Sequence, residues 1–391
     1  MTIIPLKIPA GFYRTGTDLD ASGRWRDGSL VRWRDGSLRP IGGWRNNENI
    51  ASFTTNTPRG MHTWESVLGG RYVAAGSYNE LKAALSGGTV YDIAPTDLVA
   101  GTKNAAVNIG YGYGFYGAGT YGTPRPDTGN LEEATSCSID NFGQFLVACS
   151  NKDGRLLEWQ LGASTKAAAI ANAPINNLGL IVTEERFIFA LGASNNPRKV
   201  QWCDRENNTQ WAALATNEAG DIELQTSGQI QTAVRTRGQT LIITDIDAHT
   251  ARYIGPPYVF GFERVGSSCG IISRMAAADV DMGVFWMGNG AFFRFDGNIV
   301  SEIKCDVHDY VFEDMNTAQK SKTWAFTNGQ FGEIWWFYPS GGSLEIDRYV
   351  AFDYKENHWL IGDLSRTAGS SRGVFTYPML MGQDGSMYDH E

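Results

Sequence analysis

The residues best suited to chemistry lie in one short segment, residues 305–309, with the sequence Cys-Asp-Val-His-Asp. Cys305 beside His308 can supply a nucleophile and its general base, and a histidine with two aspartates can bind a metal ion. A helix explains the same residues, because apolar side chains follow at helical spacing and Asp306 is suited to cap it. These apolar residues are Val307, Tyr310, Val311, Met315 and Ala318. We expect a helix with His308 and Asp309 on its solvent side, not a catalytic site.

Residues 245–249, Asp-Ile-Asp-Ala-His, have an alternation that suits a hard metal ion. Calcium loops also need a turn glycine and a later bidentate acid, and this segment lacks both, so we expect a polar turn between strands. The charges at 184–185 and 204–206 resemble the paired acids of glycosidases, but they flank strand ends, where solvated charge is ordinary. HExxH and phosphate-loop motifs are missing. The sequence therefore predicts no catalytic, cofactor-binding or metal-binding residue, no cofactor and no enzyme activity.

Composition indicates the elements that must position any site. The 391 residues include 46 Gly, where average usage of roughly 7% predicts about 27, together with 12 Trp, 16 Tyr and 19 Phe. Many glycines with many aromatic residues are typical of tight turns between short, well-packed strands, so the predicted class is all-β. With 33 Lys+Arg against 42 Asp+Glu, the net charge is −9. A protein that grips nucleic acid needs a basic face, and this sequence shows no such cluster.

Targeting signals and cysteine usage both favour synthesis in a cytosol. No apolar run reaches the roughly 18 residues of a membrane-spanning helix, and the first residues lack the features of a signal peptide. Five cysteines, an odd number without a CxxC pair, are expected to be reduced core residues. They are Cys137, Cys149, Cys203, Cys269 and Cys305.

A two-part pattern recurs seven times: an apolar strand, a turn, and a strand with an aromatic residue that is often followed by Asp. The first parts begin at residues 71, 144, 186, 239, 283, 332 and about 378, and the second parts at 90, 157, 200, 252, 293, 350 and 387. After the first copy the spacing is near 45, which suits one four-stranded propeller blade. We predict a β-propeller of six or seven blades over residues 61–391. A β-sandwich or two stacked β domains is the alternative.

Residues 1–60 are predicted to form an N-terminal β-hairpin arm. They contain a duplication, Trp-Arg-Asp-Gly-Ser-Leu at 25–30 and again at 33–38, in which each Asp-Gly favours a turn. The candidate docking residues of the arm are Trp25, Trp33 and Trp44, against the propeller or another chain. Residues of the arm could also complete a blade, which leaves the number of blades open.

A long projecting loop is predicted at about 104–130, between the first two copies of the repeat. Residues 110–122 alternate glycine with aromatic residues and cannot bury a core of their own. The loop is either a flexible surface excursion or an adaptable contact area for a neighbouring subunit or a membrane. In the second case the candidate assembly or gate residues are Tyr111, Tyr113, Phe115, Tyr116 and Tyr121.

Several of these segments resemble tail proteins of short-tailed bacteriophages. The arm carries most of the resemblance, with Trp-Arg-Asp-Gly-Ser-Leu-Val-Arg-Trp-Arg-Asp-Gly at 25–36 and Leu-Arg-Pro-Ile-Gly-Gly-Trp at 38–44. The Gly/Tyr segment ending at 121–125, the Tyr-Ile-Gly-Pro-Pro at 253–257 and the Tyr-Asp-His-Glu at 388–391 add to it. The similarity is to the tail nozzle, also called the tail tubular or packaged-DNA-stabilising hub protein.

The resemblance implies a structural virion protein, made in the host cytoplasm and placed in the viral tail. Six copies would form a ring below the portal and adaptor proteins, carry tail fibres or spikes, and contact the host's outer surface. The ring would close the DNA exit channel, retain packaged double-stranded DNA and conduct it at ejection without sequence-specific binding. An acidic wall agrees with this role, because it repels phosphates and lets a duplex slide.

Two other functions fit a propeller. A receptor-binding or glycan-processing propeller of the sialidase kind would have an arginine cluster and paired acids at its central channel. It would also have repeated S-x-D-x-G-x-T-W turns, which this sequence lacks. A cellular propeller scaffold for protein partners is compatible with the fold but leaves the resemblance unexplained.

Overall fold

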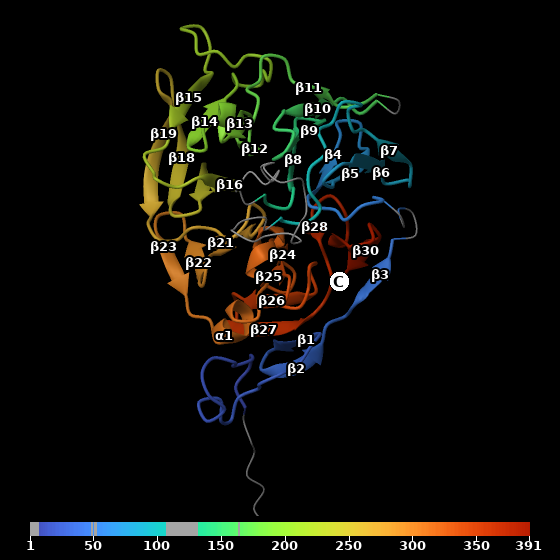
Figure 1. The fold of residues 1–391 in the computed structure, drawn as a ribbon, viewed down its shortest axis with the longest axis vertical. Helices are drawn as coiled ribbons and strands as arrows, with labels where there is room; N and C mark the ends of the chain where they lie inside the picture. Colours follow the sequence, from blue (N-terminus) through green and yellow to red (C-terminus); the bar gives the residue numbers. More distant parts are fainter. Residues whose placement is uncertain (1–7, 48–49, 51–52, 107–131, 163–164) are drawn as a thin grey trace, which may run out of the picture.

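The computed structural model describes residues 8–47, 50, 53–106, 132–162 and 165–391. These residues form seven four-stranded antiparallel sheets arranged like blades around a central channel, and one separate two-stranded hairpin (Figure 1). The fold is an all-β, seven-bladed β-propeller, which confirms the predicted class.

The blades are numbered in chain order, and the strands of each blade are given from the channel outward. Their strands are β4 (Met61–Glu65), β5 (Arg71–Gly76), β6 (Leu81–Leu85) and β7 (Val90–Asp92) in blade 1; β8 (Cys137–Phe142), β9 (Phe145–Ser150), β10 (Leu157–Trp159) and β11 (Ala168–Ala169) in blade 2; β12 (Gly179–Val182), β13 (Ile188–Leu191), β14 (Lys199–Trp202) and β15 (Gly220–Glu223) in blade 3; β16 (Ile230–Thr236), β17 (Gln239–Thr244), β18 (Ala248–Gly255) and β19 (Val259–Gly266) in blade 4; β20 (Ala277–Val280), β21 (Gly283–Met287), β22 (Phe292–Phe295) and β23 (Val300–Ile303) in blade 5; β24 (Trp324–Asn328), β25 (Glu333–Tyr338), β26 (Arg348–Asp353) and β27 (His358–Asp363) in blade 6; and β28 (Ala368–Ser370), β29 (Met379–Met381), β30 (Met387–His390) and β3 (Trp44–Asn46) in blade 7.

Both ends of the chain contribute to blade 7. The strand β3 pairs antiparallel with β30, with Trp44 opposite His390 and Asn46 opposite Tyr388. Each inner strand contacts the inner strand of the next blade, and β28 contacts β4, so the ring is closed. The predicted boundary at residue 60 therefore needs correction, because residues 44–46 of the arm belong to the propeller. The structure shows that residues of the arm complete blade 7.

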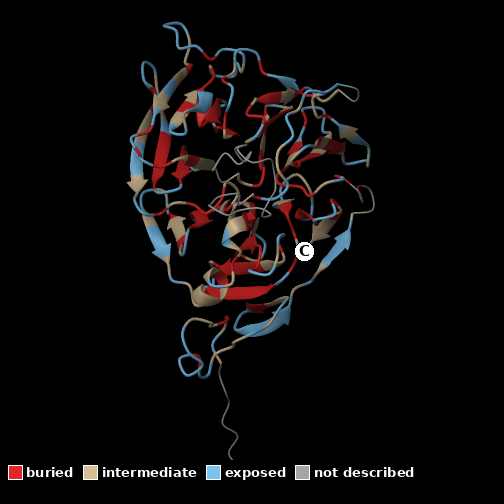
Figure 2. Cartoon of the chain, viewed as in Figure 1, coloured by how far each residue is buried: buried red, intermediate tan, exposed pale blue. Residues whose placement is uncertain are grey.

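In six blades, the two-part sequence pattern corresponds to the second and third strands. The second strands of blades 4, 5 and 6, which are β17, β21 and β25, are buried along their whole length. Figure 2 shows this buried colouring inside the blades and exposed residues along the outer strands. Blade 1 differs from the prediction, because residues 90–92 form its fourth strand and its third strand is Leu81–Leu85.

The rest of the N-terminal arm packs against blade 6. Its hairpin consists of β1 (Val31–Arg34) and β2 (Ser37–Pro40), joined at Asp35 and Gly36, which both have positive φ angles of 52° and 71°. Positive φ at both positions matches the turn that Asp-Gly favours in tight hairpins. The second Asp-Gly of the duplication therefore makes the predicted turn.

Helices form only a small part of the described residues. The α-helix α1 (His308–Phe312) and the 3₁₀ helix η2 (Thr317–Lys322) both lie between blades 5 and 6, and a short 3₁₀ turn η1 (Ala193–Asn195) lies in blade 3. In the part of the chain that the structure describes, no helix is long and apolar enough to cross a membrane.

Candidate functional site

The central channel is the place where all seven blades meet. It contains a cavity with a volume of about 270 Å³, lined by residues from the inner strand of every blade. A wider hollow of about 700 Å³ continues from one end and shares Arg235 and Asp279 with the cavity. A cavity at the convergence of several elements is the usual place for a binding site, so we take the channel as the candidate site.

The two openings of the channel can be told apart by the direction of the inner strands. We call the opening at which these strands begin the N-mouth and the opposite one the C-mouth. Arg59, Arg274 and Lys322 precede β4, β20 and β24, which places them toward the N-mouth. Asp140 and Arg235 lie near the ends of β8 and β16, toward the C-mouth.

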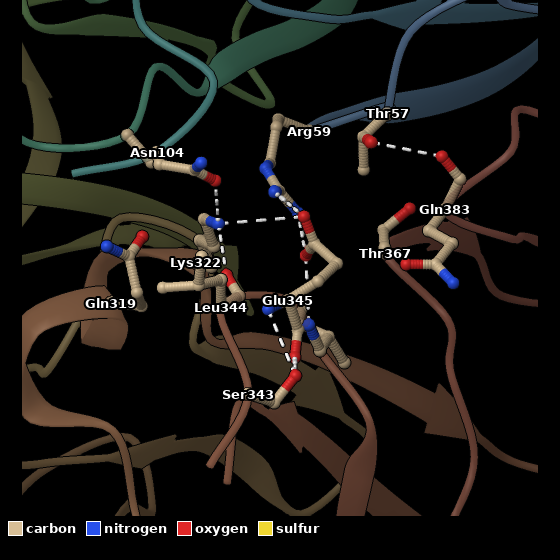
Figure 3. Close-up of polar contacts among 12 residues, drawn as sticks. Thr57, Arg59, Asn104, Gln319, Lys322, Ser343, Leu344, Glu345, Thr367 and Gln383 are labelled. Atoms are coloured by element: carbon tan, nitrogen blue, oxygen red, sulfur yellow. Dashed lines mark hydrogen bonds and ion pairs between the residues drawn. The ribbon is translucent and has the colours of Figure 1, made fainter. Parts of the chain in front are cut away.

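The N-mouth contains a buried network of three charged side chains (Figure 3). Arg59 donates to both carboxylate oxygens of Glu345, with Nη1–Oε1 2.9 Å and Nη2–Oε2 2.5 Å. Lys322 donates from Nζ to the carbonyl oxygen of Leu344 at 2.5 Å and to Oδ1 of Asn104 at 2.7 Å, and lies 3.6 Å from Oε2 of Glu345. One carboxylate therefore serves two buried cations.

Burial and charge change the acid–base properties of this network. Burial disfavours the charged amine and lowers the pKa of Lys322 to about 8. Burial alone would raise the pKa of Glu345, but the hydrogen bonds and the charge of Arg59 hold it below its ordinary value. The Lys322 ammonium therefore has a pKa close to neutral pH, and three oxygen atoms surround it.

At the same mouth, residues on both sides of segment 107–131 are held by hydrogen bonds. Gln319 on η2 accepts from the backbone N–H of Ala105 at 3.0 Å and donates to its carbonyl oxygen at 2.9 Å. On the other side, Ala134 donates its N–H to Oγ of Ser321 at 3.3 Å. Both flanks of the Gly/Tyr segment are therefore attached to η2.

At the C-mouth, one arginine connects three blades. Nη1 of Arg235 on blade 4 lies 3.0 Å and 3.2 Å from the two carboxylate oxygens of Asp140 on blade 2. The same atom donates to the carbonyl oxygen of Val182 on blade 3 at 3.0 Å. Next to this contact, Nε2 of His62 lies 2.9 Å from Oδ1 of Asn141. A histidine, an acid and an arginine thus share one end of the channel.

The channel reverses the charge balance of the whole protein. Among its described lining residues, the cations are Arg59, Arg235, Arg274 and Lys322, and the acids are Asp140 and Asp279. The chain as a whole has a net charge of −9. A cation-rich cavity with low-dielectric walls attracts anions, so the channel and the outer surface favour different partners.

The three tryptophans predicted to dock do so in different ways. Trp33 is buried in the core cluster of blades 4 to 6, with its ring 5.0 Å from that of Phe12, and Trp25 packs against it at 6.1 Å. Trp44 stacks on His390 at 5.5 Å and remains partly exposed. All three contact this chain's own propeller.

The predicted gate residues Tyr111, Tyr113, Phe115, Tyr116 and Tyr121 lie outside the described residues.

The segment at Cys305 has a structural role. A short helix follows as predicted, but Val307 is its N-cap, and Asp306 instead lies 3.2 Å from Nη2 of Arg24. Burial raises the pKa of the Cys305 thiol, which disfavours a nucleophilic thiolate. His308 is partly exposed and is held between Asp309 and the carbonyl oxygen of Gly290, both at 2.9 Å. The expected Asp306 cap is therefore wrong, and the predicted helix is confirmed only over His308–Phe312, because Met315 forms a β-bridge with Ser340 and Ala318 lies in the separate 3₁₀ helix η2.

The other candidate segments are also turns. Asp247 is buried and accepts from the hydroxyls of Thr244 and Thr226 at 2.6 and 3.0 Å, which closes the turn between β17 and β18. Glu184 lies in the turn after β12 and accepts from the N–H of Gly238 at 3.3 Å. In the described part of the chain, no group of three or more His, Cys, Asp or Glu residues could hold a metal ion.

Sequence reasoning missed the channel residues. Arg59, Arg235, Arg274 and Lys322 each stand in a different blade or connection, without a shared local motif. The structure shows what these four residues share: each lies near the start or the end of a blade's first strand. Because those strands are short and half polar, the repeat was read from the second and third strands instead.

The comparisons with known proteins concern the fold. The sequence matches no family model and no curated protein. Among solved structures, virginiamycin B lyase from Staphylococcus aureus superposes with a TM-score of 0.53 at 9% identity, covering 89% of this chain and 99% of that chain. YCF48 bound to D1 peptide superposes with a TM-score of 0.50 at 9% identity, covering 100% of this chain and 99% of that chain.

The chain is a β-propeller. At 9% identity the likeness extends to the architecture alone. One of these propellers is named as an enzyme and the other is bound to a peptide, so the shared fold is compatible with either catalysis or binding.

Proposed function

We propose that this propeller acts by binding, as a structural nozzle or hub subunit in the tail of a short-tailed bacteriophage. The supporting observation is the place of residues 25–44, which carry the strongest resemblance to tail proteins. In the fold they supply the docked hairpin β1–β2 and the strand β3 that completes blade 7. Residues 25–44 therefore attach the arm to the propeller and complete its last blade.

In the proposed role, six copies form a ring below the portal and adaptor. The cavity of about 270 Å³ in one propeller is far too small for a DNA duplex, so the duplex would run along the ring axis, past the outer surfaces of the subunits. The net charge of −9 would repel its phosphates and disfavour stalling. Fibres or spikes would attach to the exposed loops of the ring.

A reconstruction of intact virions tests this proposal. Six copies of the chain should surround the tail axis below the adaptor. A virion that lacks the chain, or that carries it as a three-fold spike, would overturn the proposal. Virions assembled without the chain should leak packaged DNA, which gives an independent readout of retention.

A receptor-binding or glycan-processing propeller is the second candidate, and the channel favours it. That class was expected to have arginines and acids at the channel, and Arg59, Arg235 and Arg274 line it together with Asp140 and Asp279. The test is to incubate the protein with sialylated and uronic-acid-containing oligosaccharides. Hydrolysis or saturable binding that Arg235→Ala removes and Arg45→Ala retains would support this candidate. Absence of both would leave the tail role as the better account.

A further inference from the structure

We propose that the central channel binds a small ligand carrying oxyanion groups, carboxylate or phosphate, with Arg274 as its principal contact and Arg235 as a second one. The proposal goes beyond the tail role and does not depend on it. It rests on the N–H donors of these two guanidinium groups that make no hydrogen bond among the described residues, in a cavity lined by more cations than acids.

Two of the four channel cations already have strong partners. Arg59 makes a two-pronged contact with Glu345, and Lys322 donates to two oxygen atoms within 2.7 Å. A ligand would have to break these bonds to use either group. These two residues therefore contribute positive potential at the N-mouth rather than direct contacts.

Arg274 is different, because its side chain is nearly buried without being fully paired. Its side chain is 10% exposed, and its Nε has no hydrogen-bond partner among the described residues. Its other contacts are long, with Nη2 3.3 Å from Oε2 of Glu133 and Nη1 3.5 Å from the carbonyl oxygen of Ile230. Guanidinium groups have five N–H donors, and buried donors are nearly always satisfied. An oxyanion in the cavity would accept from the Nη1 and Nη2 N–H groups of Arg274, each of which makes only one long contact.

Arg235 also has N–H donors that make no hydrogen bond among the described residues. All of its hydrogen bonds within the described part of the chain use Nη1, and its side chain is 39% exposed. The cavity reaches both arginines from neighbouring blades, Arg235 on blade 4 and Arg274 just before blade 5. A ligand with more than one oxyanion group could extend from one to the other.

The acids that line the cavity do not cancel this preference at Arg274. The carboxylate of Asp140 accepts from Arg235 and from the N–H of Val182, so its charge is already compensated. Asp279 lies at the C-mouth, where it also lines the wider hollow. Toward the N-mouth, the three cations Arg59, Arg274 and Lys322 face two acids, Glu345 and Glu133, so positive charge is in excess there.

The experiment is isothermal titration calorimetry of the full chain at low ionic strength, with pyrophosphate in one arm and citrate in the other. Saturable binding of at least one probe is expected, and the stronger arm identifies the preferred oxyanion. Arg274→Gln should weaken it by about tenfold or more, because it removes a charge-assisted, fork-shaped donor. Arg45→Gln is the matched control: this side chain is 72% exposed on β3, the outer strand of blade 7, and its loss should change the affinity less than twofold.

A second variant covers the case in which Arg274→Gln fails to fold. Arg274→Lys keeps the charge but loses the planar fork, and should give an intermediate loss of affinity. A bound probe should also raise the melting temperature of the wild type in proportion to its concentration over Kd. Absence of saturable binding by either probe, or equal weakening in the Arg45 control, would overturn the proposal. Neither result bears on the number of copies in a virion tail.

Discussion

Arg235 and Asp140 form an ion pair between blades that are not neighbours. Nη1 of Arg235 on blade 4 lies 3.0 Å from Oδ2 of Asp140 on blade 2, and the contact passes the carbonyl oxygen of Val182 on the blade between them. This pair therefore links three consecutive blades at the C-mouth.

The first prediction concerns the stability that this pair provides. Arg235→Ala should lower the free energy of unfolding by about 1–2 kcal/mol, less than a fully buried pair would lose, because solvent screens the partly exposed guanidinium. Denaturant unfolding measures the change. Arg237→Ala, which removes an exposed cation two residues away, should stay within about 0.5 kcal/mol of the wild type. Equal effects of the two variants would mean that the contact contributes nothing specific.

The second prediction concerns the attachment of the N-terminal arm. Arg32 and Glu333 are buried to 4% and 1% exposure and make two hydrogen bonds of 2.8 and 3.0 Å. Removing one partner of a buried pair leaves an uncompensated charge, so Arg32→Ala should cost about 3 kcal/mol by denaturant unfolding. The exposed neighbour Arg34 provides the control, since Arg34→Ala should change stability by less than about 0.5 kcal/mol.

A double variant separates the charge from the packing. Arg32→Met with Glu333→Gln removes both charges and should recover part of the stability that Arg32→Ala loses, because the buried Glu333 charge is no longer left unpaired. The recovery is partial, since Glu391, 2.6 Å from Nη1 of Arg32, still loses its partner. If the double variant is less stable than Arg32→Ala, packing rather than charge accounts for the loss.

The third prediction concerns the thiols. Burial raises the pKa of Cys137 and of Cys203 to about 12 and that of Cys269 to about 11, so thiolates are scarce at neutral pH. A thiol reagent should react slowly with the native protein and titrate five thiols after unfolding. Cys305→Ser combined with His308→Ala should leave infectivity intact. A native disulfide, or normal assembly without infection in the double variant, would contradict this.

The fourth prediction is a pH dependence that originates at Lys322. Its pKa is lowered from 10.5 to about 8 in the folded protein, so between these values the unfolded chain binds the proton and the folded chain does not. Stability relative to Lys322→Met should therefore rise with pH through this window, by about 2–3 kcal/mol from pH 7 to pH 10. Unfolding free energies of both proteins at the two pH values measure it. A constant or falling difference would show that the amine keeps its proton.

The fifth prediction concerns the Gly/Tyr segment. Every strand of the seven blades lies outside residues 107–131, so a chain that lacks residues 110–122 should still form the propeller. Its melting temperature should stay within about 3 °C of the wild type. If the segment makes assembly or gating contacts in the proposed tail, virions carrying the deletion should lose the tail below the adaptor, leak DNA or eject poorly. Full infectivity would make the segment a surface excursion, and unfolding would show that it supplies core contacts.

The repeat was predictable from sequence because the middle strands of the blades are buried on both faces. Strands such as β17 and β25 consist almost entirely of buried residues and therefore read as apolar runs. Blade 1 was assigned its fourth strand as the second part of the pattern, because the true third strand, Leu81–Leu85, contains a lysine and two alanines and no aromatic residue. Most outer strands, such as β15 and β23, carry few apolar residues and gave no signal, whereas β19 and β27 are richer in apolar residues.

The amino-acid sequence by itself determined the all-β class, the seven-fold repeat, the arm hairpin and the structural role of the Cys305 segment, since each depends on contacts between residues close in the chain. The ring closure and the channel depend on tertiary structure. The strand β3 meets β30 across more than 300 residues of chain, and Arg59, Arg235, Arg274 and Lys322 converge from four places. Local patterns record which face of a strand is apolar. They do not record which distant strand completes the ring, because that pairing depends on how seven twisted sheets fit around one axis.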